Sequence, residues 1–156
     1  MFFGDFCLGW DFLGGQGEFC FLDLGCYDVA GLGYGAWEAF CFARAQMQKK
    51  RRIQKLILLS PWLEPLASSN LARILALYAK SKFSPYLLQN PTTPHPHVWN
   101  LEALLELVVY GVSIEVYVGG KNEIMDADGV CELFSRVGVV YYLKDFGYLL
   151  QDFCFV

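Results

Sequence analysis

The sequence predicts an α/β domain in three layers, with a mostly parallel sheet and a small inserted cap. Two observations carry this prediction. Short apolar segments with strand character alternate with longer segments in which apolar residues recur at helical spacing. Strands separated by helices need crossover connections, and these join parallel strands. Because 156 residues is a typical length for one domain, we expect residues 1–156 to form a single compact unit.

The N-terminal half contains three expected strands and one helix. Residues 2–7 form a short strand before a glycine-rich loop, and 18–24 are ambiguous between a strand and a helical turn. Residues 26–30 form a strand between two glycines. From residue 35 apolar residues recur at helical spacing, and the basic run KKRR at 49–52 closes this helix at the negative end of its dipole. Residues 53–60 form the next strand, which a proline stops.

The second half begins with a proline-rich stretch, residues 61–98, in which we expect a cap with a helix over 70–80. Asn100 is an expected N-cap for the next helix, which Gly111 ends as a left-handed residue. A strand follows over 112–118. Further expectations are a helix over 126–137 capped by Asp126, a strand over 139–143 and a final helix over 147–155.

Composition and charge exclude several functional classes. Hydrophobic residues make up 55% of the chain and charged residues 18%. Disordered chains have few hydrophobic and many charged residues, so this composition excludes a disordered chain. A net charge of −4 argues against nucleic-acid binding. The most apolar window, 99–120, carries three glutamates, which make a membrane span costly. The N-terminus lacks the basic segment of a secretory signal, so we expect a cytoplasmic protein. Because that compartment is reducing, we expect the six cysteines to be thiols.

Ligands of open parallel sheets bind where the strands end, so the loops after the expected strands are the places to search. The loop at 31–35 reads GLGYG between a strand and a helix. It keeps the frame of the G-x-S-x-G nucleophile elbow, whose glycines allow a sharp turn, but its middle residue is Gly33. A dinucleotide-binding loop is an alternative interpretation, although the acidic residue expected about 20 positions later is missing.

Four segments of the chain resemble the α/β-hydrolase superfamily: YDVAGLGYGAWEA, KKRRIQKLILLSPW, VSIEVYVGGKNEI and LKDFGYLLQ. More narrowly, they are similar to the compact pimeloyl-acyl-carrier-protein methyl ester esterases of biotin biosynthesis. The resemblance is firm over 26–62 and 112–151 and loose over 63–98. It implies an α/β-hydrolase-like fold, an esterase-like function without a cofactor, and an acyl carrier protein or a small acyl ester as partner.

The resemblance also implies where the catalytic triad should be, and all three positions are substituted. The serine position is Gly33, the acid position is Asn122 and the histidine position is Tyr148. Glycine offers no nucleophile, asparagine carries no charge, and a phenol, with an ordinary pKa near 10, is a poor base at neutral pH. We therefore expect a pseudoenzyme or an acyl- or carrier-binding protein. The alternative is an active carboxylic ester hydrolase that uses non-standard residues.

Other site residues follow from the same resemblance. The backbone N–H groups of Tyr34 and Trp10 are the expected oxyanion-hole donors, although simple packing explains Trp10 equally well. Arg73, Lys80 and Lys82 lie in the expected cap, near the mouth of the site, and are the candidates for docking a carrier protein. The basic run at 49–52 is expected at the opposite edge of the sheet.

Four residues outside the triad positions could supply chemistry. Ser60 and Cys7 lie near the expected active edge and are candidate replacement nucleophiles, but the sequence favours a strand stop for Ser60 and a buried thiol for Cys7. His95 and His97 lie in the proline-rich loop, and nothing nearby in the sequence completes a metal site. We therefore expect no metal and no cofactor.

Overall fold

The computed structural model describes residues 2–3, 6–9, 26–64, 68–80 and 98–150. The strands in these ranges form one sheet whose spatial order is the chain order. The two N-terminal strands are antiparallel and every later pair is parallel. The strands are β1 (Phe2–Phe3), β2 (Phe6–Gly9), β3 (Cys26–Leu32), β4 (Arg52–Leu59), β5 (Ser113–Gly119) and β6 (Val139–Leu143).

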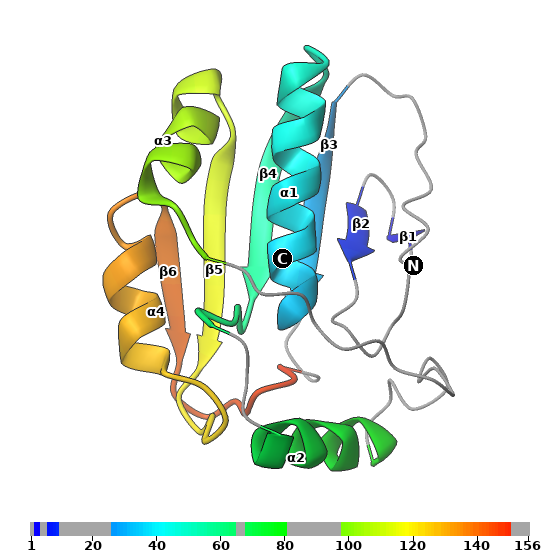
Figure 1. Ribbon diagram of the computed structural model, residues 1–156, viewed down its shortest axis with the longest axis vertical. Helices are drawn as coiled ribbons and strands as arrows, with labels where there is room; N and C mark the ends of the chain where they lie inside the picture. The colour runs from blue at the N-terminus through cyan, green and yellow to red at the C-terminus, as the bar shows by residue number, and fades with distance from the viewer. Residues whose placement is uncertain (1, 4–5, 10–25, 65–67, 81–97, 151–156) are drawn as a thin grey trace.

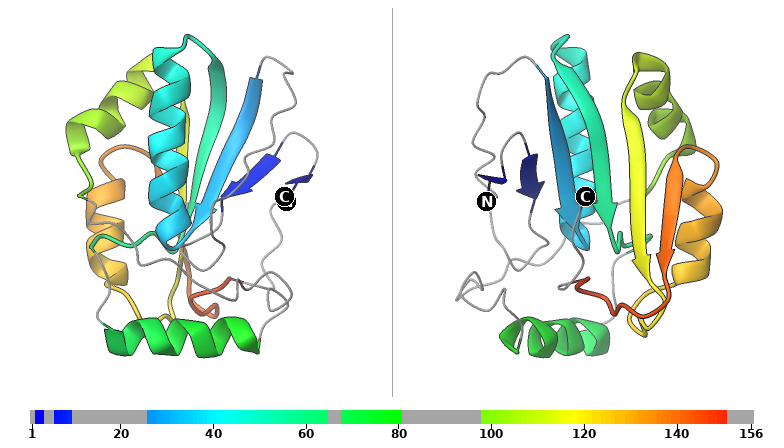
Figure 2. Two further views of the ribbon diagram at one scale, coloured as in Figure 1. Left: turned by 45° about the vertical axis from the view of Figure 1, so that its right-hand side comes forward. Right: turned by 180° about the vertical axis from the view of Figure 1, so that it is seen from behind.

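Three helices cover one face of the sheet, and a fourth crosses the edge where the parallel strands end (Figures 1 and 2). The three are α1 (Tyr34–Gln48), α3 (Leu101–Tyr110) and α4 (Ala127–Phe134), and the fourth is α2 (Ser68–Ala79). Right-handed crossovers that always step in the same direction must place their helices on the same side. The common side of α1, α3 and α4 is therefore a consequence of the strand order.

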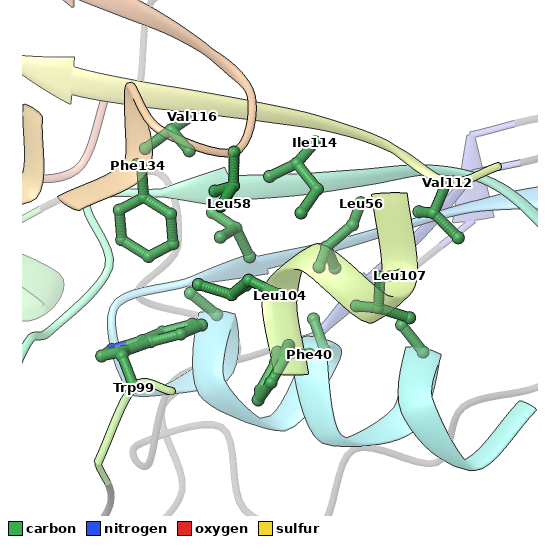
Figure 3. Close-up of a cluster of buried hydrophobic side chains, with 14 of the residues drawn as sticks. Phe40, Leu56, Leu58, Trp99, Leu104, Leu107, Val112, Ile114, Val116 and Phe134 are labelled. Carbon is green, nitrogen blue, oxygen red and sulfur yellow. The ribbon is translucent and has the colours of Figure 1, made fainter. Parts of the chain in front are cut away.

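The main core lies between these three helices and the sheet (Figure 3). Leu56, Leu58 and Val116 point from the strands toward the helices, and Phe40 and Leu104 meet them from α1 and α3. Four aromatic rings pack together in this core, with centroids 5.0–5.3 Å apart: Trp37, Phe40, Trp99 and Phe134. Such separations suit tilted and edge-on ring pairs. This packing holds in place the strands whose carboxyl ends carry the candidate site.

The other face of the sheet carries a second buried cluster near its carboxyl edge. Ala30, Ile57 and Tyr117 supply the strand side chains of this cluster, and Tyr148 and Leu149 pack against them from the segment after β6. The segment after the last strand thus returns to the sheet instead of leaving it. This return positions Tyr148, one of the residues singled out by sequence.

Local signals explain where the helices begin and end. The Asn100 side chain accepts hydrogen bonds from the backbone N–H groups of Glu102 and Ala103, at 2.9 and 3.3 Å. Gly111 ends α3 in the left-handed conformation, with φ at 104°. Asp126 caps α4 by accepting from Gly129 N at 2.9 Å. These three residues have the roles that the sequence predicted.

The α/β fold class and the mostly parallel sheet are confirmed, and several details of the prediction are wrong. Residues 2–7 do not form one strand, because β1 and β2 fold back on each other as an antiparallel pair. Helix α4 ends at Phe134 and not at residue 137. Residues 147–150 form turns instead of a helix. The basic run closes α1 as expected through Lys49, its C-cap, whereas Lys50 and Arg51 follow the helix and Arg52 is the first residue of β4. Residues 18–24 and 151–155 lie outside the described ranges.

None of the described helices is both long and apolar enough to span a bilayer.

Candidate functional site

The turn between β3 and α1 has the geometry of a nucleophile elbow. Gly33 adopts φ 61° and ψ −119°, a conformation that residues with side chains rarely adopt. Its backbone N–H donates to Leu59 O at 2.8 Å, which ties the turn to the end of β4. A Cβ on Gly31 would lie 1.9 Å from Gly35 O, so the strand and the helix approach as closely as glycine permits. Gly31 is therefore a steric requirement of the turn.

The elbow presents backbone and no nucleophilic side chain. Gly33 is the residue that the turn places at its apex, and it carries no hydroxyl or thiol. Tyr34 is the first residue of α1, so its N–H is among the helix N-terminal amides that lack an intrahelical acceptor. The N-terminal end of a helix favours negative charge. Of the two expected oxyanion donors, Tyr34 therefore begins the helix as the resemblance requires, whereas Trp10 lies outside the described residues.

Tyr148, at the histidine position, is buried and its hydroxyl is engaged. Its side chain is 3% exposed, and its phenol oxygen accepts a hydrogen bond from Trp62 Nε1 at 2.7 Å. Trp62 lies three residues beyond β4 and is 1% exposed. A buried indole N–H needs an acceptor, and Tyr148 provides one. This tyrosine therefore stabilises the packing of the strand ends.

Ser60 also has a structural partner. It is fully buried, its Oγ donates to Tyr148 O at 2.7 Å, and its N–H donates to Tyr117 O at 2.9 Å. Its φ of 42° is unusual for a residue with a side chain. These bonds join the ends of β4 and β5 to the segment after β6. The hydroxyl proton that a nucleophile would have to release is thus held by a backbone carbonyl.

Asn122, at the acid position, shapes its own loop. Its Oδ1 accepts from the backbone N–H of Ile124 at 2.9 Å, a local bond typical of asparagine in turns. Its Nδ2 is buried and has no hydrogen-bond partner in the described part of the chain. A neutral amide in this place carries no charge that could stabilise an imidazolium. Gly33, Asn122 and Tyr148, the positions at which the resemblance implies a triad, therefore lie on loops after β3, β5 and β6 at one edge of the sheet.

A cavity of about 340 Å³ opens beside Tyr148, between α2 and the loops after β5 and β6. Its apolar wall consists of Ala76, Leu77, Ile124 and the Tyr148 ring, and the rest of its lining is Arg73, Lys80, Lys121, Glu123 and Gly147. Three lining residues are cationic and one is anionic. A pocket of this size is at the lower end of the range of small-molecule sites.

Side chains connect α2 to the loop after β5 across this cavity. Arg73 contacts Glu123 twice, through an ion pair of 3.2 Å and a bond of 3.3 Å to its carbonyl. Asn70 Nδ2 donates to Ile124 O at 3.3 Å. On the other side of the loop Lys121 pairs with Asp145 at 3.3 Å. Exposed pairs of this kind contribute about 0–1 kcal/mol each, so they orient α2 without locking it.

The structure thus brings some predicted residues together and not others. Arg73 and Lys80 line the cavity, whereas Lys82, His95 and His97 lie outside the described ranges. The backbone of Cys7 is described in β2 but its side chain is not. Within the described residues, no group of three or more His, Cys, Asp and Glu side chains could hold a metal ion.

Sequence reasoning missed Trp62 and Lys121, and it interpreted Glu123 only as a solvated or capping residue. A tryptophan directly after the stop of a buried strand is a signal that could have been used, because a buried indole must find an acceptor nearby. Lys121 and Glu123 flank Asn122 and were identifiable only by their position in the loop.

Comparison with solved structures shows the fold of this chain. The carboxylesterase NP (naproxen esterase) of Bacillus subtilis superposes with a TM-score of 0.58 and 17% identity, covering 82% of this chain and 56% of the esterase. A serine hydrolase involved in carbazole degradation superposes with a TM-score of 0.55 and 10% identity, covering 85% of this chain and 60% of the hydrolase. The thioesterase domain of the curacin biosynthetic pathway superposes with a TM-score of 0.53 and 14% identity, covering 83% of this chain and 62% of the thioesterase.

The chain spans a little over half the length of these hydrolases. No protein-family model and no curated protein sequence matches it. The identities are too low to show more than the fold. The chain therefore has the α/β-hydrolase fold.

Proposed function

We propose that this chain is a catalytically inactive protein of the α/β-hydrolase fold that binds an acyl ligand at the carboxyl edge of its sheet. The observation that carries the proposal is Gly33 at the apex of the elbow. The turn, the flanking glycines and the helix N-terminus resemble a hydrolase site, and the nucleophile alone is missing from the apex. The resemblance to pimeloyl-carrier methyl ester esterases makes a pimeloyl-type acyl group the first ligand to test.

Loss of chemistry is supported by the occupation of the other two triad positions. Tyr148 accepts from Trp62, and its carbonyl accepts from Ser60. Asn122 uses its carbonyl oxygen to hold its own loop. Removing a triad leaves at most about 10³–10⁴-fold acceleration, supplied by the oxyanion hole and by binding. A protein with none of the three residue types is therefore expected to fall far below a working esterase.

Binding is supported by the cavity next to the vacant site. Its apolar wall suits an alkyl chain, and Lys80, which takes part in none of the ion pairs found between described residues, suits a carboxylate or a carrier phosphate at the mouth. Desolvating an alkyl chain favours binding by about 0.8 kcal/mol per buried methylene. In this proposal α2 is the described part of the expected cap and lies over the ligand.

Ester hydrolysis tests the loss of chemistry. The purified parent is compared with the triple variant Gly33→Ser/Asn122→Asp/Tyr148→His on p-nitrophenyl butyrate and on monomethyl pimelate. We expect the parent to leave the spontaneous rate unchanged. Turnover that is proportional to the parent's concentration, and is abolished by Ser60→Ala or Cys7→Ala, would establish the alternative of an active esterase with non-standard residues.

Ligand binding is tested separately, by calorimetric titration of the parent with monomethyl pimelate and with the pimeloyl-loaded carrier protein. The variant Arg73→Gln/Lys80→Gln removes two cations from the cavity. The matched control Arg136→Gln/Lys144→Gln removes two exposed cations that do not line it. We expect weaker binding in the first variant and parental binding in the control. Equal binding by all three proteins would show that the cavity is not the site.

A further inference from the structure

A basic and apolar surface lies at the end of the molecule opposite the candidate site. Lys49 and Lys50 follow the last residue of α1, Arg51 comes next, and Arg52 is the first residue of β4. All four side chains are exposed. None of them takes part in any ion pair that the described residues form. We call these four residues the basic turn.

Exposed apolar side chains lie next to the basic turn. They belong to the last turn of α3, where Val109 is 88% exposed, Tyr110 43% and Val108 37%. Val109 and Tyr110 share a groove with Met47, which lies two residues before the basic turn. Figure 1 shows the upper ends of α1 and α3 beside the beginnings of β4 and β5. We call Val108, Val109 and Tyr110 the apolar tip.

The strand register explains why the two groups are neighbours. Lys55 of β4 pairs with Ser113 of β5, and neighbouring strands lie about 5 Å apart. Arg52 is three residues before Lys55, and Tyr110 is three residues before Ser113. Both chain segments therefore emerge side by side from the same edge of the sheet. The backbone bond from Val112 N to Leu107 O, 3.0 Å long, holds the end of α3 there.

Burial does not explain the apolar tip, and the fold does not require the basic turn. The core face of α3 is already supplied by Ala103, Leu104 and Leu107. Two acidic residues of the same helix, Glu102 and Glu106, also line the groove, but they are fewer than the four cations. Glu106 is paired with Arg44 at 3.5 Å, and Glu102 lies in the first turn of α3. Cations and exposed apolar groups at one edge are the combination by which proteins attach peripherally to anionic bilayers.

We propose that the basic turn and the apolar tip together bind an anionic lipid surface. The headgroup phosphates and carboxylates would contact the four cations, and Val109 and Tyr110 would enter the boundary between headgroups and acyl chains. The whole chain carries a net charge of −4, so attraction to an anionic surface has to come from a local concentration of cations. Docking by this edge would leave the cavity at the opposite edge facing the solution.

The test is co-sedimentation of the parent with phosphatidylcholine vesicles that contain or lack phosphatidylserine. Near an anionic surface each Lys or Arg strengthens binding by roughly fivefold. We expect Lys49→Gln/Arg52→Gln to weaken binding about 25-fold, and Val109→Ser to weaken it at constant charge. The control is Arg136→Gln/Lys144→Gln/Val139→Ser, at exposed positions near β6, and it should bind like the parent.

Raising the salt concentration should release the parent from the phosphatidylserine vesicles, because exposed charges are screened. Thermal unfolding of each variant confirms that it is folded. No binding to the phosphatidylserine vesicles would overturn the proposal and would leave an acidic protein as the partner to seek. Equal binding by the basic-turn variant and the parent, or equal binding to both kinds of vesicle, would also overturn it. None of these outcomes depends on whether the candidate site binds an acyl ligand.

Discussion

The elbow can be tested by a series of glycine-to-alanine substitutions, because the structure predicts a different cost at each position. Gly33 has φ 61° and ψ −119°, and forcing a residue with a side chain into a sparsely populated conformation costs about 1–3 kcal/mol. Gly31 is more demanding, since its Cβ would lie 1.9 Å from the carbonyl oxygen of Gly35. The backbone must separate to accept that methyl group, at a cost of about 3 kcal/mol or more.

Gly147 is the matched control. Nothing lies within 4 Å of a Cβ built on it, and its φ is not in the left-handed range. Alanine there should leave stability unchanged or raise it by up to about 1 kcal/mol, because it restricts the unfolded chain. The assay is urea unfolding followed by tryptophan fluorescence, with thermal unfolding beside it. At this chain length 1 kcal/mol corresponds to a shift of roughly 2–4 °C in the midpoint.

The predicted order of stability is therefore Gly147→Ala above Gly33→Ala above Gly31→Ala. If Gly33→Ala were as stable as Gly147→Ala, the backbone at the apex would not be strained. The argument that glycine relieves strain where a hydrolase carries its nucleophile would then fail. If Gly31→Ala were fully stable, the close approach of β3 and α1 would be refuted.

Three further predictions concern burial, capping and the strand-end hydrogen bonds. Burial raises the pKa of Glu38 from 4.5 to about 7, so the folded state holds an extra proton between these values. The free energy of unfolding should fall by at most about 3 kcal/mol as the pH rises from 4.5 to 7. Urea titrations at several pH values measure this fall, and Glu38→Gln should remove it. Asn100→Ala removes an N-cap that accepts two hydrogen bonds and should cost about 1 kcal/mol, whereas Asn100→Asp should restore most of it in the same assay. Tyr148→Phe removes the acceptor of the Trp62 indole N–H and should cost about 1–3 kcal/mol by thermal unfolding, and a variant as stable as the parent would contradict the structural role given to this hydroxyl.

Features of the fold that depend on local signals could be predicted from the sequence. The helix over 101–110 was predictable because Asn100 and Gly111 mark its two ends. The strand over 139–143 was predictable as a short aromatic and β-branched run. The elbow turn could be located because its glycines are close in sequence, and Gly31 among them is sterically required.

Features that depend on distant contacts could not be predicted. The segment after β6 has an apolar pattern that favours a helix, but Tyr148, Leu149 and Leu150 are all buried in succession against the sheet. A helix would turn one of these three side chains away from the sheet. The bonds that hold this segment join residues 86 and 88 positions apart in the chain, namely Trp62 and Ser60 to Tyr148. No periodicity within a short window carries such information.

The same distinction applies to the candidate site. Motif positions were sufficient to place Gly33, Asn122 and Tyr148 on three loops at one edge of the sheet. The sequence did not reveal that Tyr148 is tied to Trp62 or that α2 contacts the loop after β5 through Arg73 and Glu123. Those contacts decide whether the positions can act chemically, and they arise only from the packing of the folded chain.

The central claim, that this hydrolase fold has no working nucleophile, is tested most directly by covalent labelling. The parent is incubated with a fluorophosphonate, which reacts with activated serines, and with iodoacetamide at neutral pH, and the intact mass is then measured. The account predicts no phosphonate adduct. It also predicts that thiols are alkylated slowly, and at the same rate in the parent and in the Cys7→Ala variant. A stoichiometric phosphonate adduct at Ser60, or rapid alkylation confined to Cys7, would contradict the account and show that the site retains a nucleophile.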